Sequence, residues 1–360
     1  MKQLEVDLIC GPETVQVYGA LKVSREISSR VQDISFNTIQ YPVLLKHYIA
    51  EYLTKRYIYP WIVKKSVKQG NIKHITFQDY AFIASFLNND PVIISCLDLI
   101  EPLYYHKKST FLLHNLAGLK RADYLVTISE FSKKQIIEFL SYPDEQIYVI
   151  SMGVNHSLYY PQTDRKILEQ FSLSPDNRVI LYVGSEEPRK NVDTILWAVS
   201  LVRKRIPGIV FLKVGNPQWA GAREDLIHLI DKLHLEGSVV FTGYIPEEDL
   251  PKYYNAADLF VFPSSYEGFG LPVLEAMACG CPVVTSNCTS IPEVVGDAAI
   301  MVTPGDVDEL AHAIERVLFD DGLREEMTQK GIRQSMRFTW DKAAEKMVEM
   351  YKRVFRREIV

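Results

Sequence analysis

The sequence predicts an α/β protein built from two open, doubly wound sheets. Short β-branched runs alternate with segments of helical period, as in repeated βα units around a parallel sheet. The runs are almost continuously apolar, which suits strands that helices cover on both faces. The length of 360 residues corresponds to two domains at about 100–200 residues each.

The strands are expected in order along the chain, with helices between them. In the first half they are 4–10, 71–77, 92–98, 124–129 and 146–151, and in the second half 178–183, 209–214, 238–242, 258–262 and 282–286. A polar stretch with a proline at 159–164 predicts a linker. We therefore expect domains at 1–160 and 161–340, facing each other across a cleft. A last helix at about 341–360 could pack back on the first domain.

The composition is that of a globular chain and excludes several classes of protein. Hydrophobic residues make up 47% and charged residues 24%. The net charge of −5 argues against a general nucleic-acid binder, because such proteins carry a basic excess that neutralises phosphates. No apolar run approaches the about 18 residues of a membrane-spanning helix. An interrupted, charged start and an odd number of cysteines, five, favour a cytoplasmic protein with reduced thiols.

A glycine-rich turn follows the strand expected at 258–262. It runs from Glu267 through Gly268, Phe269, Gly270 and Leu271 into a helix with Pro272 at its first position and Glu275 in its first turn. Glycines let backbone N–H groups approach a ligand, and a helix start offers unpaired donors, so the turn suits a phosphate. Glu267 and Glu275 would accept hydrogen bonds from sugar and ribose hydroxyls. The alternative is a Glu275 that only complements the helix dipole and a solvated Glu267.

A second loop follows the strand expected at 178–183 and runs from Gly184 to Asn191. Its adjacent Arg189 and Lys190 can clamp a diphosphate, the guanidinium through paired hydrogen bonds and the ammonium as a compact charge. Alone, the pair would indicate only solvated surface charge. Two anion-binding patterns at neighbouring strand ends of one sheet are less easily coincidental.

The two motifs closely resemble those of retaining glycosyltransferases of family 4, group 1 enzymes with the GT-B fold of two Rossmann-like domains. The resemblance continues through 279–286 and 291–299 and covers nearly all of the chain from Val149 onward. It implies transfer of a hexose, such as mannose or glucose, from a nucleotide diphosphate sugar to a glycan or lipid-linked acceptor. GDP-mannose and UDP-glucose are the donors it suggests, and it implies no cofactor and no metal ion.

The resemblance also implies roles for matching residues. Glu275 would bind the ribose, and Glu267 would lie by the donor sugar. Arg189 and Lys190 would neutralise the leaving diphosphate, on which negative charge grows as the bond breaks. Further donor contacts are expected at Gly184, Gly268, Phe269, Gly270 and Leu271, and at Tyr244 and Ile245 around the base. Retention without an obvious nucleophile suggests that the leaving diphosphate guides the acceptor hydroxyl to the same face.

The first half departs from the family pattern in two places. Only Gly11 stands in the loop after the first strand, where relatives commonly have a glycine-rich loop. Leu97 stands where many relatives have the histidine of a His-Asp pair near the reacting carbon, so only Asp98 remains as a catalytic candidate. His106 and His114 lie nearby in the sequence, although a lone histidine is more often structural.

Two further segments suggest helix caps. Asp306 and Asp308 have the spacing of an Asp-x-Asp metal motif, but apolar residues at helical spacing follow them. Asp306 is therefore expected to cap a helix, and no metal site is predicted. Ser129 or Glu130 is expected to cap another helix.

The segment 46–73 combines basic and aromatic residues. They are Lys46, Lys55, Arg56, Lys64, Lys65, Lys68 and Lys73, interleaved with Tyr48, Tyr52, Tyr57, Tyr59 and Trp61. Such a surface suits peripheral contact with an anionic membrane, where each basic residue contributes about 1 kcal/mol. The alternative is a basic helix whose aromatic side chains lie in the core, because Pro60 interrupts a long amphipathic helix.

Two other functions stay open at this point. A nucleotide-sugar epimerase on the same fold would need acid and base groups around the sugar and no acceptor. A sugar-nucleotide-binding subunit that has lost catalysis would agree with Leu97 in place of histidine. The sequence leaves the sugar, the base, the acceptor, the linkage and the oligomeric state open.

Overall fold

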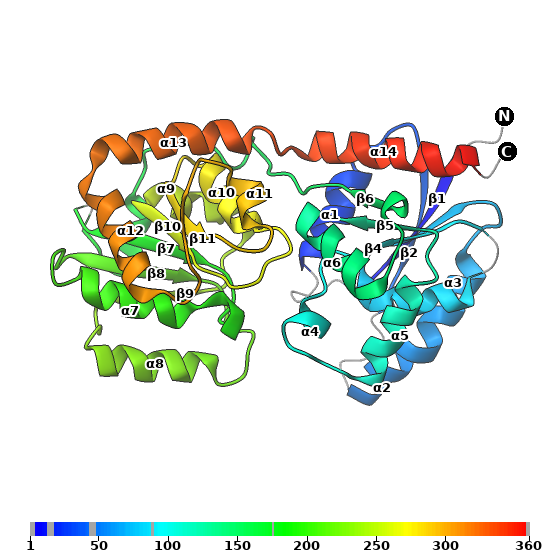
Figure 1. Ribbon diagram of the computed structural model, residues 1–360, viewed down its shortest axis with the longest axis horizontal. Coiled ribbons are helices and arrows are strands. Elements are labelled where there is room, and N and C mark those ends of the chain that lie inside the picture. The colour runs from blue at the N-terminus through cyan, green and yellow to red at the C-terminus, as the bar shows by residue number, and fades with distance from the viewer. Residues whose placement is uncertain (1–3, 13–17, 43–47, 88–89, 175, 358–360) are drawn as a thin grey trace. The chain divides into compact units, whose positions relative to one another are not determined.

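The computed structural model describes residues 4–12, 18–42, 48–87, 90–174 and 176–357, without the side chains of 18–21, 48–50 and 357. The chain forms two compact units (Figure 1). Unit 1 contains Met1–Gly153 and Trp340–Val360, and unit 2 contains Val154–Thr339. The chain passes between the units after residues 153 and 339, whereas the sequence suggested 160 and 340.

Unit 1 contains a parallel sheet in the order β2-β1-β3-β4-β5-β6. The strands are β1 (Glu5–Cys10), β2 (Ser35–Gln40), β3 (Ile72–Ile75), β4 (Val92–Ser95), β5 (Tyr124–Thr127) and β6 (Ile147–Val149). The sequence pattern misses β2 because this edge strand is largely polar and mostly accessible to solvent. The strand order reverses between β1 and β3.

Helices cover both faces of this sheet (Figure 1). They are α1 (Tyr18–Ser28), α2 (Tyr48–Leu53), α3 (Tyr59–Ser66), α4 (Ile100–Leu103), α5 (Thr110–Leu119), α6 (Glu130–Leu140) and α14 (Trp340–Arg357), with a 3-10 segment at Gln78–Phe86. As predicted, Ser129 caps α6, since its side chain accepts the N–H of Ser132 at 3.0 Å. α14 packs against α1, and its Tyr351 hydroxyl lies 2.5 Å from Nδ1 of the buried His74 on β3.

Unit 2 contains a second parallel sheet, in the order β12-β11-β10-β7-β8-β9. Its strands are β7 (Arg178–Val183), β8 (Ile209–Val214), β9 (Val239–Gly243), β10 (Leu259–Phe262), β11 (Val283–Ser286) and β12 (Ile300–Val302). β12 is a three-residue edge strand that the sequence pattern did not predict. The order reverses between β7 and β10, as in dinucleotide-binding sheets.

The helices of unit 2 also lie on both faces of the sheet (Figure 1). They are α7 (Val192–Val202), α8 (Ala222–Leu233), α9 (Leu250–Ala256), α10 (Leu271–Ala278), α11 (Ile291–Val295), α12 (Val307–Phe319) and α13 (Asp321–Ser335). The Asp306 side chain accepts the N–H of Glu309 at 2.9 Å. Asp306 is therefore the N-cap of α12, as predicted.

Candidate functional site

The candidate site of unit 2 lies where the strand order reverses. β7 and β10 are adjacent and parallel, with Leu259 paired to Ile180, so the loops that follow them leave the same edge of the sheet. The two loops are hydrogen-bonded to each other: Asn191 Nδ2 donates to the Pro263 carbonyl, and the Ser265 N–H donates to the Arg189 carbonyl, both at 2.8 Å. Open α/β sheets bind their ligands at this position.

Two glycines shape these loops. Gly184 has a φ of 155°, and a Cβ atom there would lie 2.7 Å from the Tyr182 hydroxyl. Gly270 has a φ of 102°, and a Cβ atom there would lie 2.5 Å from Cδ1 of Ile291. Only glycine adopts these backbone conformations without strain. Gly184 therefore allows the first loop to turn directly after β7, and Gly270 allows the second loop to turn directly before α10.

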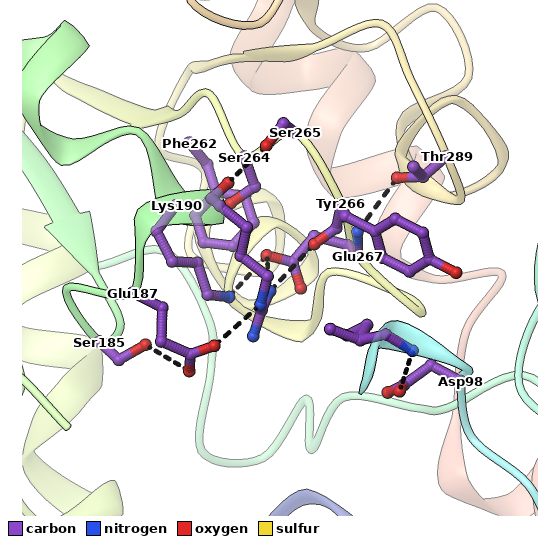
Figure 2. Close-up of polar contacts among 12 residues, drawn as sticks. Asp98, Ser185, Glu187, Lys190, Phe262, Ser264, Ser265, Tyr266, Glu267 and Thr289 are labelled. Carbon is purple, nitrogen blue, oxygen red and sulfur yellow. Dashed lines mark hydrogen bonds and ion pairs between the residues drawn. The ribbon is translucent and has the colours of Figure 1, made fainter. Parts of the chain in front are cut away.

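Arg189, Lys190 and Glu267 form a buried charge cluster between these loops. Figure 2 shows Lys190 and Glu267 of this cluster. Lys190 Nζ and Arg189 Nη1 donate to the same oxygen, Glu267 Oε1, at 2.5 and 3.1 Å. Arg189 also donates to Glu187 Oε2 at 3.0 Å and to the Tyr266 carbonyl at 2.9 Å. The structure thus brings together the charged residues that the sequence singled out in two separate motifs.

Burial and proximity shift the pKa values in this cluster. Burial is the largest influence on Lys190 and lowers its pKa below the ordinary 10.5, although Glu267 opposes the shift. Burial would raise the pKa of Glu267, but the attraction of Lys190 and Arg189 outweighs it and leaves that pKa below 4.5. Glu267 is therefore a carboxylate that two cations share. A ligand that brings its own negative charge would compete with Glu267 for both of them.

Glu275 lies on α10, but not in its first turn as the sequence suggested. α10 begins at Leu271 after Gly270, so Pro272 is its second residue and Glu275 its fifth. A carboxylate in the second turn complements the helix dipole poorly, which argues against that alternative. The Glu275 side chain is buried, and its Oε2 accepts the Tyr254 hydroxyl at 3.0 Å.

The other donor contacts expected in unit 2 lie at the same edge of the sheet. Gly268 and Phe269 are buried in the turn between β10 and α10, and Leu271 opens α10. Tyr244 and Ile245 follow β9 directly, and the Tyr244 side chain is 60% exposed.

Sequence reasoning missed a second buried cluster under the loop after β7. Glu186 Oε1 lies 2.6 Å from Lys213 Nζ, and both Glu186 oxygens lie 3.0 Å from Arg223 Nε. Burial lowers the pKa of Lys213 to about 8, against the opposing attraction of Glu186. The signal was a lysine within the apolar run of β8, because a buried charge needs a partner.

In unit 1, the predicted site residues follow β1 and β4. The Gly11 carbonyl accepts Gln40 Nε2 at 2.9 Å. β4 ends at Ser95 rather than at residue 98, so the buried Leu97 and the partly exposed Asp98 lie in the following loop. The Asp98 carboxylate accepts the N–H of Ile100 at 3.1 Å.

The two histidines considered as replacements for Leu97 are both exposed. His106 lies between α4 and α5, with a φ of 51°. His114 lies on α5.

The segment 46–73 contains a helical stretch that Pro60 does not interrupt. Lys46 and the Tyr48 side chain lie outside the described residues. α2 continues into a π-helical turn, Thr54–Ile58, and then into α3. The N–H of Tyr59 bonds the Thr54 carbonyl five residues back, and Pro60 stands in the first turn of α3, where its missing N–H is tolerated.

The aromatic side chains of this stretch divide between core and surface. Tyr59 is buried, and its hydroxyl donates to the Ile39 carbonyl at 3.0 Å. Tyr52, Tyr57 and Trp61 are 54%, 62% and 63% exposed. The alternative that places the aromatic residues in the core is therefore wrong for these three.

The basic side chains of the segment divide in the same way. Lys64, Lys65 and Lys68 are exposed. Lys73 is only 2% exposed and therefore does not belong to this surface. Lys55 Nζ lies 4.2 Å from the centre of the Phe111 ring, and burial lowers its pKa.

Three further findings concern metal ions, membranes and thiols. Within the described ranges, no group of three or more His, Cys, Asp or Glu side chains could hold a metal ion. Among the helices that the structure describes, none is long and apolar enough to span a membrane. None of the five cysteines, all of which lie within the described residues, forms a disulfide.

Comparison with known sequences relates unit 2 to one family. Residues 164–334 match the family model described as "Glycosyl transferases group 1". The chain is 39% identical over 243 residues to O-antigen chain mannosyltransferase B of Escherichia coli, covering 65% of this chain and 62% of that protein. It is 34% identical over 253 residues to the serotype-specific mannosyltransferase WbdA of Escherichia coli, covering 68% of this chain and 30% of that protein. The chain thus spans less than two thirds of either relative.

Solved structures share the fold of the whole chain. HepE of Anabaena in complex with UDP-glucose matches with a TM-score of 0.80 at 19% identity, over 96% of this chain and 99% of that chain. Sucrose-phosphate synthase from Thermosynechococcus elongatus matches with a TM-score of 0.77 at 23% identity, over 98% and 99%. At these identities the likeness shows the fold, and it confirms the predicted GT-B architecture of two Rossmann-like domains.

Proposed function

Because residues 164–334 match the model of the glycosyl transferases group 1 family and the chain has the GT-B fold, we propose that the protein is a retaining glycosyltransferase. It transfers a hexose from a nucleotide diphosphate sugar to a glycan or lipid-linked acceptor. The observation that carries the proposal is the cluster at the strand switch point, where Arg189 and Lys190 share one oxygen of Glu267. Two adjacent buried cations at this place suit a diphosphate.

In the proposed reaction, the donor diphosphate replaces Glu267 beside the two cations. Arg189 offers paired donors and Lys190 a compact charge, in surroundings where electrostatic interactions are stronger than in water. When the bond to the sugar breaks, negative charge grows on the diphosphate, and the two cations stabilise it. The displaced Glu267 carboxylate can then accept hydrogen bonds from the donor sugar.

Other residues are proposed to hold the rest of the donor. Glu275 exchanges its hydrogen bond from Tyr254 for the ribose hydroxyls. The backbone of Phe269–Leu271 meets the phosphates at the start of α10. Tyr244 and Ile245, together with the turn at Gly184, border the nucleotide. Asp98 stays the catalytic candidate of unit 1.

We propose that turnover needs no metal ion, because the two cations supply the charge that the leaving group requires. The anomeric configuration is retained if the departing diphosphate guides the acceptor hydroxyl to the same face of the sugar that the diphosphate leaves.

For the transferred sugar we propose mannose. Two relatives are named mannosyltransferases, which supports GDP-mannose as the donor to test first. A solved neighbour was crystallised with UDP-glucose, which makes UDP-glucose the donor for comparison.

The test of the donor site is a panel of GDP, UDP, GDP-mannose and UDP-glucose, with thermal unfolding as the readout. A ligand at 100 times its dissociation constant adds about 2.7 kcal/mol. One base should stabilise the protein selectively, and Lys190→Ala should abolish the shift. Lys204→Ala, which removes an exposed lysine of unit 2, should preserve it.

The matching turnover test follows release of the nucleoside diphosphate with and without EDTA. Transfer that stops with EDTA would contradict the metal-free part of the proposal. Formation of a new sugar nucleotide without acceptor would instead support an epimerase.

A binding subunit without catalysis is the second candidate, and Leu97 in place of histidine favours it. Leu97 is buried, and its N–H donates to Gln78 Oε1 at 2.9 Å. Tight donor binding without transfer or donor hydrolysis over a broad acceptor panel would support this candidate.

We also propose that unit 1 contacts an anionic membrane through its exposed α2–α3 surface, defined by Tyr52, Tyr57, Trp61, Lys64, Lys65 and Lys68. Aromatic side chains favour the bilayer interface, and each basic residue contributes about 1 kcal/mol on an anionic surface. A lipid-linked acceptor would be presented there.

Sedimentation with vesicles tests this contact. The protein should bind vesicles of phosphatidylglycerol and phosphatidylcholine but not vesicles of phosphatidylcholine alone. Trp61→Ser should weaken binding about 10-fold, in keeping with the cost of moving an aromatic ring out of the interface. Trp219→Ser, at a 39% exposed tryptophan of unit 2, is the matched control and should have no effect. Equal binding to both kinds of vesicle would contradict the proposal.

A further inference from the structure

Two consecutive side chains after β11 hold both polar backbone groups of Glu267. Thr289 Oγ1 accepts the Glu267 N–H at 3.2 Å (Figure 2). Ser290 Oγ donates to the Glu267 carbonyl at 2.9 Å, and Ser290 is completely buried. The backbone that carries the central carboxylate of the site is therefore fixed by the loop after β11.

Thr289 makes its contact from an unusual conformation. Its φ is 57°, in the left-handed region that β-branched residues rarely occupy. The other left-handed residues that the structure describes are glycines or His106, Ser141, Ser172, Asn191, Gln218 and His234, and none of these is β-branched. Glycine would adopt this turn without strain but would leave the Glu267 N–H without its partner.

The hydrogen bond from Glu267 to Thr289 becomes decisive when the donor binds. In the free site the Glu267 carboxylate is anchored by Lys190 and Arg189. Once a diphosphate takes both cations, the carboxylate loses these anchors, and the position of its backbone determines where it can reach.

We infer that Thr289 is a positioning residue that aims the released Glu267 carboxylate at the donor sugar. This inference rests on the proposed function. It predicts that Thr289 matters for the sugar part of the donor and not for the diphosphate, because Thr289 contacts the Glu267 backbone and not the two cations.

The experiment compares Thr289→Gly and Thr289→Ser with Ser172→Gly. Thr289→Gly should lower kcat about 10-fold by misplacing the carboxylate. Its unfolding temperature should stay within about 2 °C of the wild type or rise, because relief of strain offsets the lost hydrogen bond. Thr289→Ser keeps the hydroxyl and should restore most of kcat.

Ser172→Gly is the matched control, because it relieves the same kind of backbone strain at an exposed position. It should keep or raise the unfolding temperature and leave kcat unchanged.

Binding provides the second readout. Affinity for the nucleoside diphosphate should be unchanged in Thr289→Gly, whereas the additional affinity for the nucleotide sugar should be lost. The inference is overturned if Thr289→Gly keeps kcat, if activity falls only in step with stability, or if diphosphate affinity falls equally.

The same readout separates failure of the inference from failure of the proposed function. A wild-type protein that binds the nucleotide sugar more tightly than the diphosphate but never transfers the sugar would refute the proposed transferase activity. The binding comparison in Thr289→Gly would then still test the role of Thr289. A wild-type protein without that preference would overturn the inference, because Glu267 would then contact no sugar.

Discussion

Lys73 of unit 1 and Lys190 of unit 2 are both buried against carboxylates, but they lie at opposite ends of their sheets. Lys73 stands near the amino end of β3, with its Nζ 3.3 Å from Asp7 Oδ2 and 3.2 Å from Asp90 Oδ2. Lys190 stands beyond the carboxyl end of β7 and shares Glu267 with Arg189.

The ratio of charges also differs between the two clusters. Lys73 is one cation between two carboxylates, and it also donates to the Asn71 carbonyl at 2.8 Å, so its donors are used within the protein. Lys190 and Arg189 share one oxygen of Glu267, and Arg189 also pairs with Glu187, so here the carboxylates do not outnumber the cations. Burial and pairing alone therefore do not mark a functional site. The position at the strand switch point, where β7 lies beside β10, does.

Lys73→Met should have the largest effect of the changes that test this comparison. It leaves the fully buried Asp7 without its cation and should cost about 3–5 kcal/mol in the free energy of unfolding. Turnover by the protein that stays folded should be unchanged. Urea unfolding measures the stability, and kcat at low temperature measures the turnover. A large loss of kcat in folded Lys73→Met protein would contradict a purely structural role for the Lys73 cluster.

Lys190→Ala should reverse this pattern. Turnover should fall about 100–1000-fold, as for loss of one electrostatic contact to a developing charge. Stability should change less than in Lys73→Met, because Glu267 keeps Arg189. Steady-state kinetics and urea unfolding on the same preparation provide the measurement. A variant that unfolds as readily as Lys73→Met would show that Lys190 is mainly structural.

His74 should make the stability of unit 1 depend on pH. Burial lowers its pKa from 6.5 to about 3. Below pH 6.5 His74 is protonated in the unfolded chain, whereas in the folded protein it is protonated only below about pH 3. The free energy of unfolding therefore falls as the pH falls from 6.5 to 3. Between pH 7 and pH 5 the loss should be about 2 kcal/mol.

His74→Gln should remove this loss. The free energy of unfolding, measured at both pH values in the wild type and the variant, would show it as a smaller difference in the variant. Equal differences would mean that His74 is protonated in the folded protein.

The smallest effect is expected at an exposed pair of the same chemistry. Lys107 Nζ lies 2.8 Å from Glu101 Oε1, but both side chains are about half exposed. Lys107→Ala should change the free energy of unfolding by less than about 1 kcal/mol. A larger loss of unfolding free energy in urea would show that an exposed pair can contribute as much as the buried Lys73, so that burial does not explain the difference.

The fold of the central strands was predictable because buried parallel strands have long apolar runs. β7, β8 and β10 stand within a residue of their predicted ranges. The edge strand β2 was not predictable, since it is largely polar. The edge strand β12 was also missed, although β6, which is equally short, was predicted.

The candidate site was predictable where chemistry and spacing coincide in the sequence. Arg189 and Lys190 are adjacent after one strand, and Glu267 precedes a glycine turn after another. Glu186 with Lys213, and Thr289 with Glu267, were not predictable, because their partners are distant in the chain and meet only through strand order.

The alternation of strands and helices and the two glycine-bearing loops can be read from the amino-acid order alone, because they depend on local periodicity and backbone freedom. The adjacency of β7 and β10, in contrast, is visible only in the folded chain. That adjacency places two cations from one loop on the carboxylate of another, since the pairing of strands that are distant in sequence depends on how the whole sheet packs.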